Sequence, residues 1–215
     1  MARRARGTAA GLDRDRIAAA AVALVDRDGL ERFGVRRLAD ELGVDPMSIY
    51  HHVKGKAALL DAVSEAVLGE IAAPDPAGDD AADGDADWRD VARGLAHAYR
   101  DLAYRHPHVF PLLATRAQTS PVAVSALESL VAAMRRAGLP DRVVADAPMA
   151  LFGFLNGHLL ARTTAGQAAV PAFDADTHPT MAALAPRWAD FGSAAELDRL
   201  LDVVLSGLAQ RAAGG

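Results

Sequence analysis

The sequence predicts an all-α protein, and three observations point to that class. Apolar residues make up 51% of the chain but aromatic residues only 5%. The core must therefore be built mainly from Ala, Leu and Val, a composition that favours helix. Several segments repeat apolar residues at the i, i+3, i+4 spacing of an amphipathic helix, and no segment shows the alternation of a strand.

The first predicted helix covers residues 13–28. Asp13 is a good N-cap, because its carboxylate can accept hydrogen bonds from free backbone N–H groups, and Gly29 ends the helix. The buried stripe is formed by Ile17, Ala20, Ala21, Leu24 and Val25. Residues 1–11 precede it as a basic arm with Arg3, Arg4 and Arg6. The arm is either a phosphate or minor-groove contact or a solvated tail.

The segment 36–56, RRLADELGVDPMSIYHHVKGK, predicts two short helices joined by a tight turn. The first would cover residues 35–42 and end at Gly43, and Val44 would plug the turn. Asp45 is a suitable N-cap for the second helix, and Pro46 occupies its first position, where a missing N–H costs nothing. Two short helices with a glycine-containing turn form a helix-turn-helix unit, whose second helix, residues 46–52, can enter the major groove of DNA.

Several side chains of this unit suit contacts with DNA. Arg36 can place two donors on guanine O6 and N7, and Pro46 and Met47 can meet thymine methyl groups. Donors that suit phosphates, which fix the position of the helix without reading sequence, are Ser48, Tyr50, His51, Lys54 and Lys56. Taken singly, each could equally be an ordinary exposed side chain.

The charge distribution agrees with a nucleic-acid contact at the N-terminal end. The chain has a net charge of −5, but residues 1–60 hold 11 basic and 8 acidic residues, and the remainder holds 12 and 20. A basic segment is thus joined to an acidic body. Lys54 and Lys56 are the only lysines in a chain with 21 arginines. Either a compact ammonium group is required there or the placement is chance.

The rest of the chain predicts a C-terminal helical domain over residues 56–215, after an N-terminal domain over 1–55. Its first helix, 56–72, would connect the two domains. Residues 74–87 hold six Asp and no basic residue, and we expect a solvated loop there, because the ligand spacing of a calcium loop is missing. Further helices are expected over residues 88–105, 109–115, 121–137, 142–164 and 194–211, with a short helix around 180–191.

The sequence patterns of two of these predicted helices indicate a homodimer. In segment 194–211, residues Leu197, Leu201, Val204 and Leu208 follow alternating steps of four and three, which is typical of a coiled-coil seam, and Leu200 and Leu205 widen it. Segment 142–164 carries Gly153 and Gly157 one turn apart, which would allow another helix to approach closely. We expect these helices from two copies to form a four-helix bundle; alternatively, they complete the core of one chain.

Other classes of protein have little support in the sequence. There are no cysteines, no apolar run near the roughly 18–20 residues of a membrane span, and no signal sequence, so we expect a cytoplasmic protein without membrane contact. No catalytic motif occurs, and we expect no enzyme activity, no cofactor and no metal site. The rival is a helical metal-dependent enzyme using His97, His106 and His108.

Residues 12–63 resemble the DNA-binding domain of the tetracycline-repressor (TetR) family. The resemblance rests on the LGV turn, the Ile49-Tyr50 pair, His52-Val53-Lys54 and the following Lys56-x-x-Leu59-Leu60. The body resembles the tetracycline repressor subgroup at Trp88-Arg89-Asp90, Thr115-Arg116, residues 153–159 and the final helix. The resemblance implies an all-helical homodimer, a palindromic double-stranded operator, and a ligand cavity in each body.

This chain departs from that pattern at several positions. Gly34-Val35 stands where the family has a Ser or Thr before the arginine, which removes a phosphate contact. Positions that hold the drug and magnesium in the tetracycline sensor match Ala72, Leu95 and Leu112, so magnesium-tetracycline does not fit. A more apolar effector fits a cavity lined by Leu95, Tyr99, Phe110, Leu112, Met134, Phe152 and Asn156, with Thr115 and Arg116 retained; these residues could equally be plain core.

Together these features predict a ligand-responsive repressor. Operator and effector would favour different separations of the two recognition helices, so that binding one weakens the other. The alternative is a constitutive DNA-binding regulator without a small-molecule effector.

Overall fold

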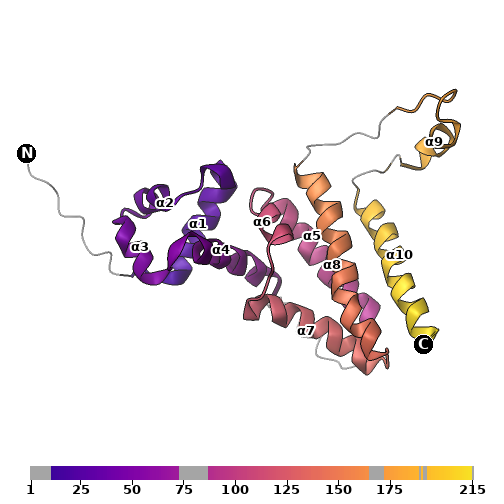
Figure 1. The fold of residues 1–215 in the computed structure, drawn as a ribbon, viewed down its shortest axis with the longest axis horizontal. Coiled ribbons are helices and arrows are strands. Elements are labelled where there is room, and N and C mark those ends of the chain that lie inside the picture. Colours follow the sequence, from indigo (N-terminus) through magenta and orange to yellow (C-terminus); the bar gives the residue numbers. More distant parts are fainter. Residues whose placement is uncertain (1–10, 73–86, 165–171, 189, 191–192, 215) are drawn as a thin grey trace, which may run out of the picture. The chain divides into compact units, whose positions relative to one another are not determined.

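The computed structural model describes residues 11–72, 87–164, 172–188, 190 and 193–214, and every regular element in these ranges is helical (Figure 1). The helices, in chain order, are α1 (Arg14–Asp28), η1 (Leu30–Arg32), α2 (Val35–Leu42), α3 (Pro46–His52), α4 (Gly55–Ala72), α5 (Trp88–Arg105), α6 (Phe110–Thr115), α7 (Pro121–Arg136), α8 (Asp141–Thr164), α9 (Pro179–Leu184), η3 (Ala185–Trp188) and α10 (Ala194–Ala213). The all-α prediction is confirmed. The basic arm before Gly11 and the acidic segment 74–86 lie outside the described residues.

The chain divides into two compact units, residues 1–84 with 97–129 and residues 85–96 with 130–215. Helix ends agree with the prediction to within two residues, except that the helix expected around 180–191 is the short α9 followed by the 3-10 turn η3. The domain boundary expected after residue 55 stays a prediction.

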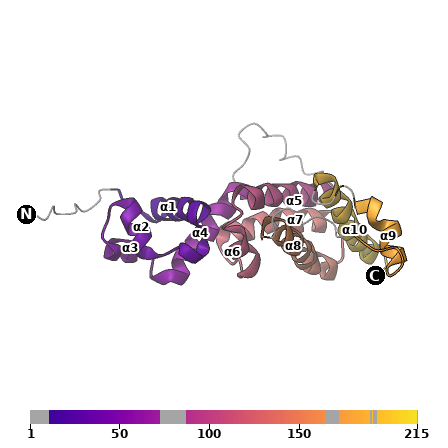
Figure 2. The ribbon, with the colours of Figure 1, turned by 90° about the horizontal axis from the view of Figure 1, so that it is seen from above.

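In the first unit, α1 packs on both α2 and α4 (Figure 2). The Asp13 carboxylate accepts from the Arg16 N–H at 2.7 Å, as expected of an N-cap, and Gly29 ends α1 with a φ of 80°. The fully buried side chains Ile17, Leu24 and Leu38 form the centre of the small core. Leu42, the last residue of α2, is half-exposed.

In the second unit, α8 and α10 lie side by side (Figure 1). The buried face of α10 consists of Leu197, Leu201, Leu205 and Leu208. The seam predicted for a partner copy is therefore mostly used inside the chain, and Val204 is only half-buried. The leucine spacing correctly predicts that one face of α10 is buried. It does not identify the helix that covers this face. The apolar side chains that stay exposed on α10 are Leu200 and Val203.

The sequence predicts no apolar run near the length of a membrane span, but α8 passes that test by length and composition. An 18-residue window within residues 141–163 has a mean hydropathy of 1.3, and the helix is long and apolar enough to cross a membrane, by length and composition alone. Isolated polar residues such as Asn156 interrupt the apolar run in the sequence without making the helix polar on average. Only 33% of this window is buried inside the chain. The helix thus keeps apolar and small-residue surface that its own chain does not cover.

Candidate nucleic-acid interface

The turn between α2 and α3 forms through local hydrogen bonds that the sequence dictates. Gly43 adopts the left-handed conformation with a φ of 66°. The Val44 N–H then donates to the Ala39 carbonyl at 2.9 Å, which closes α2 in a Schellman motif. Asp45 accepts from the Met47 N–H at 2.8 Å and caps α3. The path of the chain into α3 is fixed on both sides of the turn.

The two faces of α3 differ in burial. Ile49 and the following Val53 are buried at 1% and 4% exposure and anchor the helix to the core. The opposite face shows Met47 at 61% and Tyr50 at 39% exposure. Exposed polar side chains accompany them at His51 and Lys54, while the predicted contacts Pro46 and Ser48 are half-exposed. The predicted reading face is thus accessible, and the roles of its residues stay predictions.

Cations near this face divide into paired and unpaired groups. Arg37 donates to Asp28 at 2.7 Å and to the Arg32 carbonyl at 3.1 Å. Arg36, Lys54 and Lys56 are exposed and form no ion pair with any residue that the structure describes. DNA can therefore engage these three groups, Arg36 at a base edge and the two lysines at phosphates, without breaking an internal bridge, whereas engaging Arg37 would break one.

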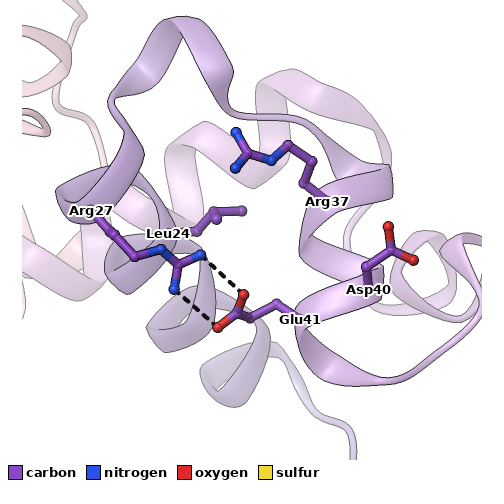
Figure 3. A pocket seen from close by; sticks show the side chains of 5 residues that line it. All are labelled: Leu24, Arg27, Arg37, Asp40 and Glu41. Carbon is purple, nitrogen blue, oxygen red and sulfur yellow. Dashed lines mark hydrogen bonds and ion pairs between the residues drawn. The ribbon is translucent and has the colours of Figure 1, made fainter.

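A pocket of about 290 Å³ lies between α1 and α2 beside this interface (Figure 3). Arg27 of α1 and Glu41 of α2 face one another across it and form two hydrogen bonds, at 3.1 and 3.0 Å. The hydrogen bond to Arg27 lowers the pKa of Glu41. Leu24, Arg37 and Asp40 complete the lining. Arg27 and Glu41 thus join α1 to α2 across this pocket, while Arg37 pairs with Asp28 at 2.7 Å.

The predicted effector residues are distributed over both units. Tyr99, Phe110, Leu112, Thr115 and Arg116 belong to the first, and Leu95, Met134, Phe152 and Asn156 to the second. In the first unit the rings of Tyr99 and Phe110 meet edge to face, with centroids 5.4 Å apart, and burial raises the pKa of the Tyr99 hydroxyl. Phe110 and Met134 have no exposed surface. That the nine residues share one cavity stays a prediction.

The two retained polar residues have internal partners. The Thr115 hydroxyl donates to the Pro111 carbonyl at 2.6 Å, one turn back along α6. Arg116 donates to Asp61 of α4 at 2.5 Å. Arg116 therefore ties the end of α6 to the connecting helix, a link that sequence spacing could not reveal because the partners are 55 residues apart.

The three histidines of the rival enzyme hypothesis do not form a metal site. Within the described ranges, no group of three His, Asp or Glu side chains is placed to hold a metal ion. His106 instead bonds Asp26 and Glu70, and the His108 ring bonds the Asp26 carbonyl at 2.7 Å. Sequence reasoning singled out His106 but missed its partners, which lie 80 and 36 residues away and leave no local signal.

The first unit therefore carries an exposed helix-turn-helix reader with unpaired cations, the arrangement used by bacterial regulatory proteins. Two family models match the chain: "Bacterial regulatory proteins, tetR family" over residues 17–63 and "Tetracyclin repressor-like, C-terminal domain" over residues 81–211. The chain belongs to the TetR family of transcription regulators.

Curated relatives include the HTH-type transcriptional repressor DrrR1 of Streptomyces coeruleorubidus, which is 33% identical over 72% of this chain and 55% of its own length. The chain spans 61% of a second such relative, an HTH-type transcriptional regulator of Saccharopolyspora erythraea, also at 33% identity over 71% of this chain. The class A tetracycline repressor of Escherichia coli is 31% identical over 89% of this chain and 88% of that protein.

Solved structures share the fold. A possible TetR family regulator from Streptomyces coelicolor superposes with a TM-score of 0.78 at 27% identity, over 92% of this chain and 99% of that one. The TetR family protein ActR of the same organism, solved in complex with (S)-DNPA, gives a TM-score of 0.77 at 26% identity, over 94% and 100% of the two chains.

Proposed function

We propose that this protein is a cytoplasmic transcriptional repressor that binds a palindromic DNA operator as a homodimer and is released by a small apolar effector. We further propose that it has no enzyme activity. The observation that carries the proposal is the exposed face of α3, flanked by the unpaired cations Arg36, Lys54 and Lys56. Such a face offers base contacts from α3 and Arg36 and phosphate contacts from the two lysines.

Exposed stripes on α8 and α10 support the homodimer. Met149, with 78% of its surface exposed, lies on one stripe with Gly153 and Gly157. Val203, with 69% exposed, lies on another with Leu200 and Gly207. Apart from its chain neighbours and the nearby backbone of its own helix, a Cβ built at any of the three glycines would meet no atom within 4 Å. Small residues beside exposed apolar ones suit close packing against a helix of a second copy.

The ligand-responsive part of the proposal rests on the family and on the chemistry of the predicted cavity. Leu95 and Leu112 replace polar positions of the tetracycline sensor, which favours an apolar effector over magnesium-tetracycline. ActR, a relative with the same fold, has been solved with the small molecule (S)-DNPA bound. A constitutive regulator is the second candidate, because Phe110 and Met134 are buried as fully as ordinary core residues.

Selection of duplexes from a random DNA library by the full chain tests the proposal. The expected product is an inverted repeat with half-sites about one helical turn, roughly 34–36 Å, apart. A single half-site, or no enrichment, contradicts dimeric operator binding. A thermal-shift screen of apolar metabolites against the selected complex then separates the two candidates. A compound that stabilises the protein and releases the duplex supports the ligand-responsive repressor, and stabilisation without release supports the constitutive one.

A further inference from the structure

His106 stands at the junction of three elements of the first unit. It follows the last residue of α5, and only 8% of its surface is exposed. Its Nδ1 lies 2.6 Å from Oδ2 of Asp26 on α1, and its Nε2 lies 3.0 Å from Oε1 of Glu70 on α4. We call these three residues the His106 cluster. A buried ring with a carboxylate on each nitrogen joins the last turns of two helices.

The geometry around the ring calls for a hydrogen-bond donor on each nitrogen. A neutral imidazole carries one N–H, whereas an ionised carboxylate can only accept, so two such bonds require the imidazolium. Arg105 of α5 also pairs with Glu70, and the His108 ring bonds the Asp26 backbone. With Arg105 and an imidazolium, the two carboxylates are balanced. Asp26 Oδ1 is buried and forms no hydrogen bond within the described structure, so its carboxylate depends on the proton from His106.

The backbone of His106 holds a fourth element. Its carbonyl accepts from the N–H groups of Val109 and Phe110, at 3.0 and 2.9 Å, where α6 begins. The side chain is thus fixed to α1 and α4, and the main chain is fixed to α6. At the other end of α6, Arg116 bonds Asp61 of α4. The start of α6 is thus linked through His106 to α1 and α4, and its end is linked through Arg116 to α4.

We propose that His106 is a positioning residue that, as an imidazolium, fixes α6 to α1 and α4 and so sets the position of the helix-turn-helix. The DNA-binding readout of this proposal rests on the proposed function, whereas the charge-dependent link between the helices does not.

Three variants of the full chain test the role of His106. His106→Gln keeps hydrogen-bonding groups but removes the charge, and His106→Arg restores a cation with several donors. His178→Gln, at an exposed histidine, controls for loss of a histidine. Affinity is measured on the selected duplex and on an unrelated duplex, at 15 °C, with circular dichroism confirming that each variant is folded. We expect His106→Gln to weaken binding to the selected duplex about tenfold, with the unrelated duplex unchanged and His106→Arg close to wild type.

Unchanged binding by His106→Gln would overturn the proposal, and so would equal weakening by His106→Gln and His106→Arg, since a purely structural role does not depend on charge. A double-mutant cycle of Asp26→Asn and His106→Gln, followed by urea unfolding, needs no DNA. We expect the two destabilisations to be non-additive, and additive values contradict the link. If wild type selects no duplex, the proposed function fails, and this cycle alone decides whether the His106 cluster joins the helices.

Discussion

The reader, which consists of α1–α3, differs from the pair formed by α8 and α10 in where apolar side chains remain exposed. In the reader, the large apolar side chains left exposed are Met47 and Tyr50, both on the recognition helix. In the α8–α10 pair, Met149, Leu200 and Val203 stay exposed on two helices that otherwise pack on one another. The apolar core of the reader is thus covered within its own chain, whereas the α8–α10 pair keeps exposed apolar surface against which a further helix could pack.

The two regions also differ in how deeply their ion pairs are buried. Arg27 and Glu41 of the reader pair at the surface, where about half of each side chain is exposed. Arg162 of α8 and Glu196 of α10 pair at 2.8 Å with only 12% and 10% of their side chains exposed. Surface pairs contribute little to stability, whereas a buried charge without its partner is costly. The second unit therefore contains a buried ion pair whose loss would be costly, whereas the Arg27–Glu41 pair of the reader contributes little to stability.

The largest expected effect comes from breaking the buried pair. Arg162→Leu leaves the Glu196 carboxylate buried without this partner and should lower the free energy of unfolding by about 3–5 kcal/mol. The matched change Arg27→Leu at the surface pair should cost far less. Urea unfolding followed by circular dichroism measures both. Equal losses for the two variants would remove the distinction between the pairs.

A charge on the exposed α10 stripe should separate the proposed dimer. Val203→Asp would bury a carboxylate against the partner copy and should weaken dimerisation about a hundredfold. Val124→Asp, at an α7 valine that is 52% exposed, is the matched control and should leave dimerisation unchanged. Sedimentation equilibrium of each variant gives the dissociation constant. A dimer that tolerates Val203→Asp would place the interface elsewhere.

Two changes in the reader should separate base reading from phosphate contact. Arg36→Ala should cost about 1–3 kcal/mol on the selected operator and relax base preference at one position. Lys56→Ala should weaken binding to all duplexes alike and lower the salt slope by about one. Fluorescence anisotropy over a salt series and a set of single-base variants measures both. An Arg36→Ala protein with unchanged base preference would show that Arg36 does not read bases.

The smallest expected effect is a pH dependence in the second unit. Burial, and then the nearby Arg162, lower the pKa of His158 below its usual 6.5. As the pH falls below 6.5, the unfolded chain therefore takes up a proton that folded His158 resists, and stability is lost. Urea unfolding at pH 7.5 and 5.5 should show a smaller loss for His158→Gln than for wild type. His178→Gln, at an exposed histidine, should keep the wild-type loss.

Features encoded by near neighbours in the sequence could be predicted, and features that join distant segments could not. Asp13, Gly43 and Asp45 fix helix ends through bonds within five residues, which is why those ends were found. The partners of His106 and Arg116 lie on other helices, and no local pattern announces them. The leucine periodicity of α10 predicts a buried face but not the helix that packs on it, because the same stripe can pack on a helix of its own chain or of a second copy.

The recognition helix has only seven residues. At about 1.5 Å per residue it is roughly 10 Å long, which spans about three base pairs. If each wrong base pair costs about 1–3 kcal/mol, one copy finds acceptable sites throughout a genome. Two joined copies multiply their discrimination, and operator occupancy then rises with the square of the protein concentration while the dimer is scarce. For the proposed dimeric repressor, a short α3 would thus make the selectivity of repression depend on the abundance of the protein.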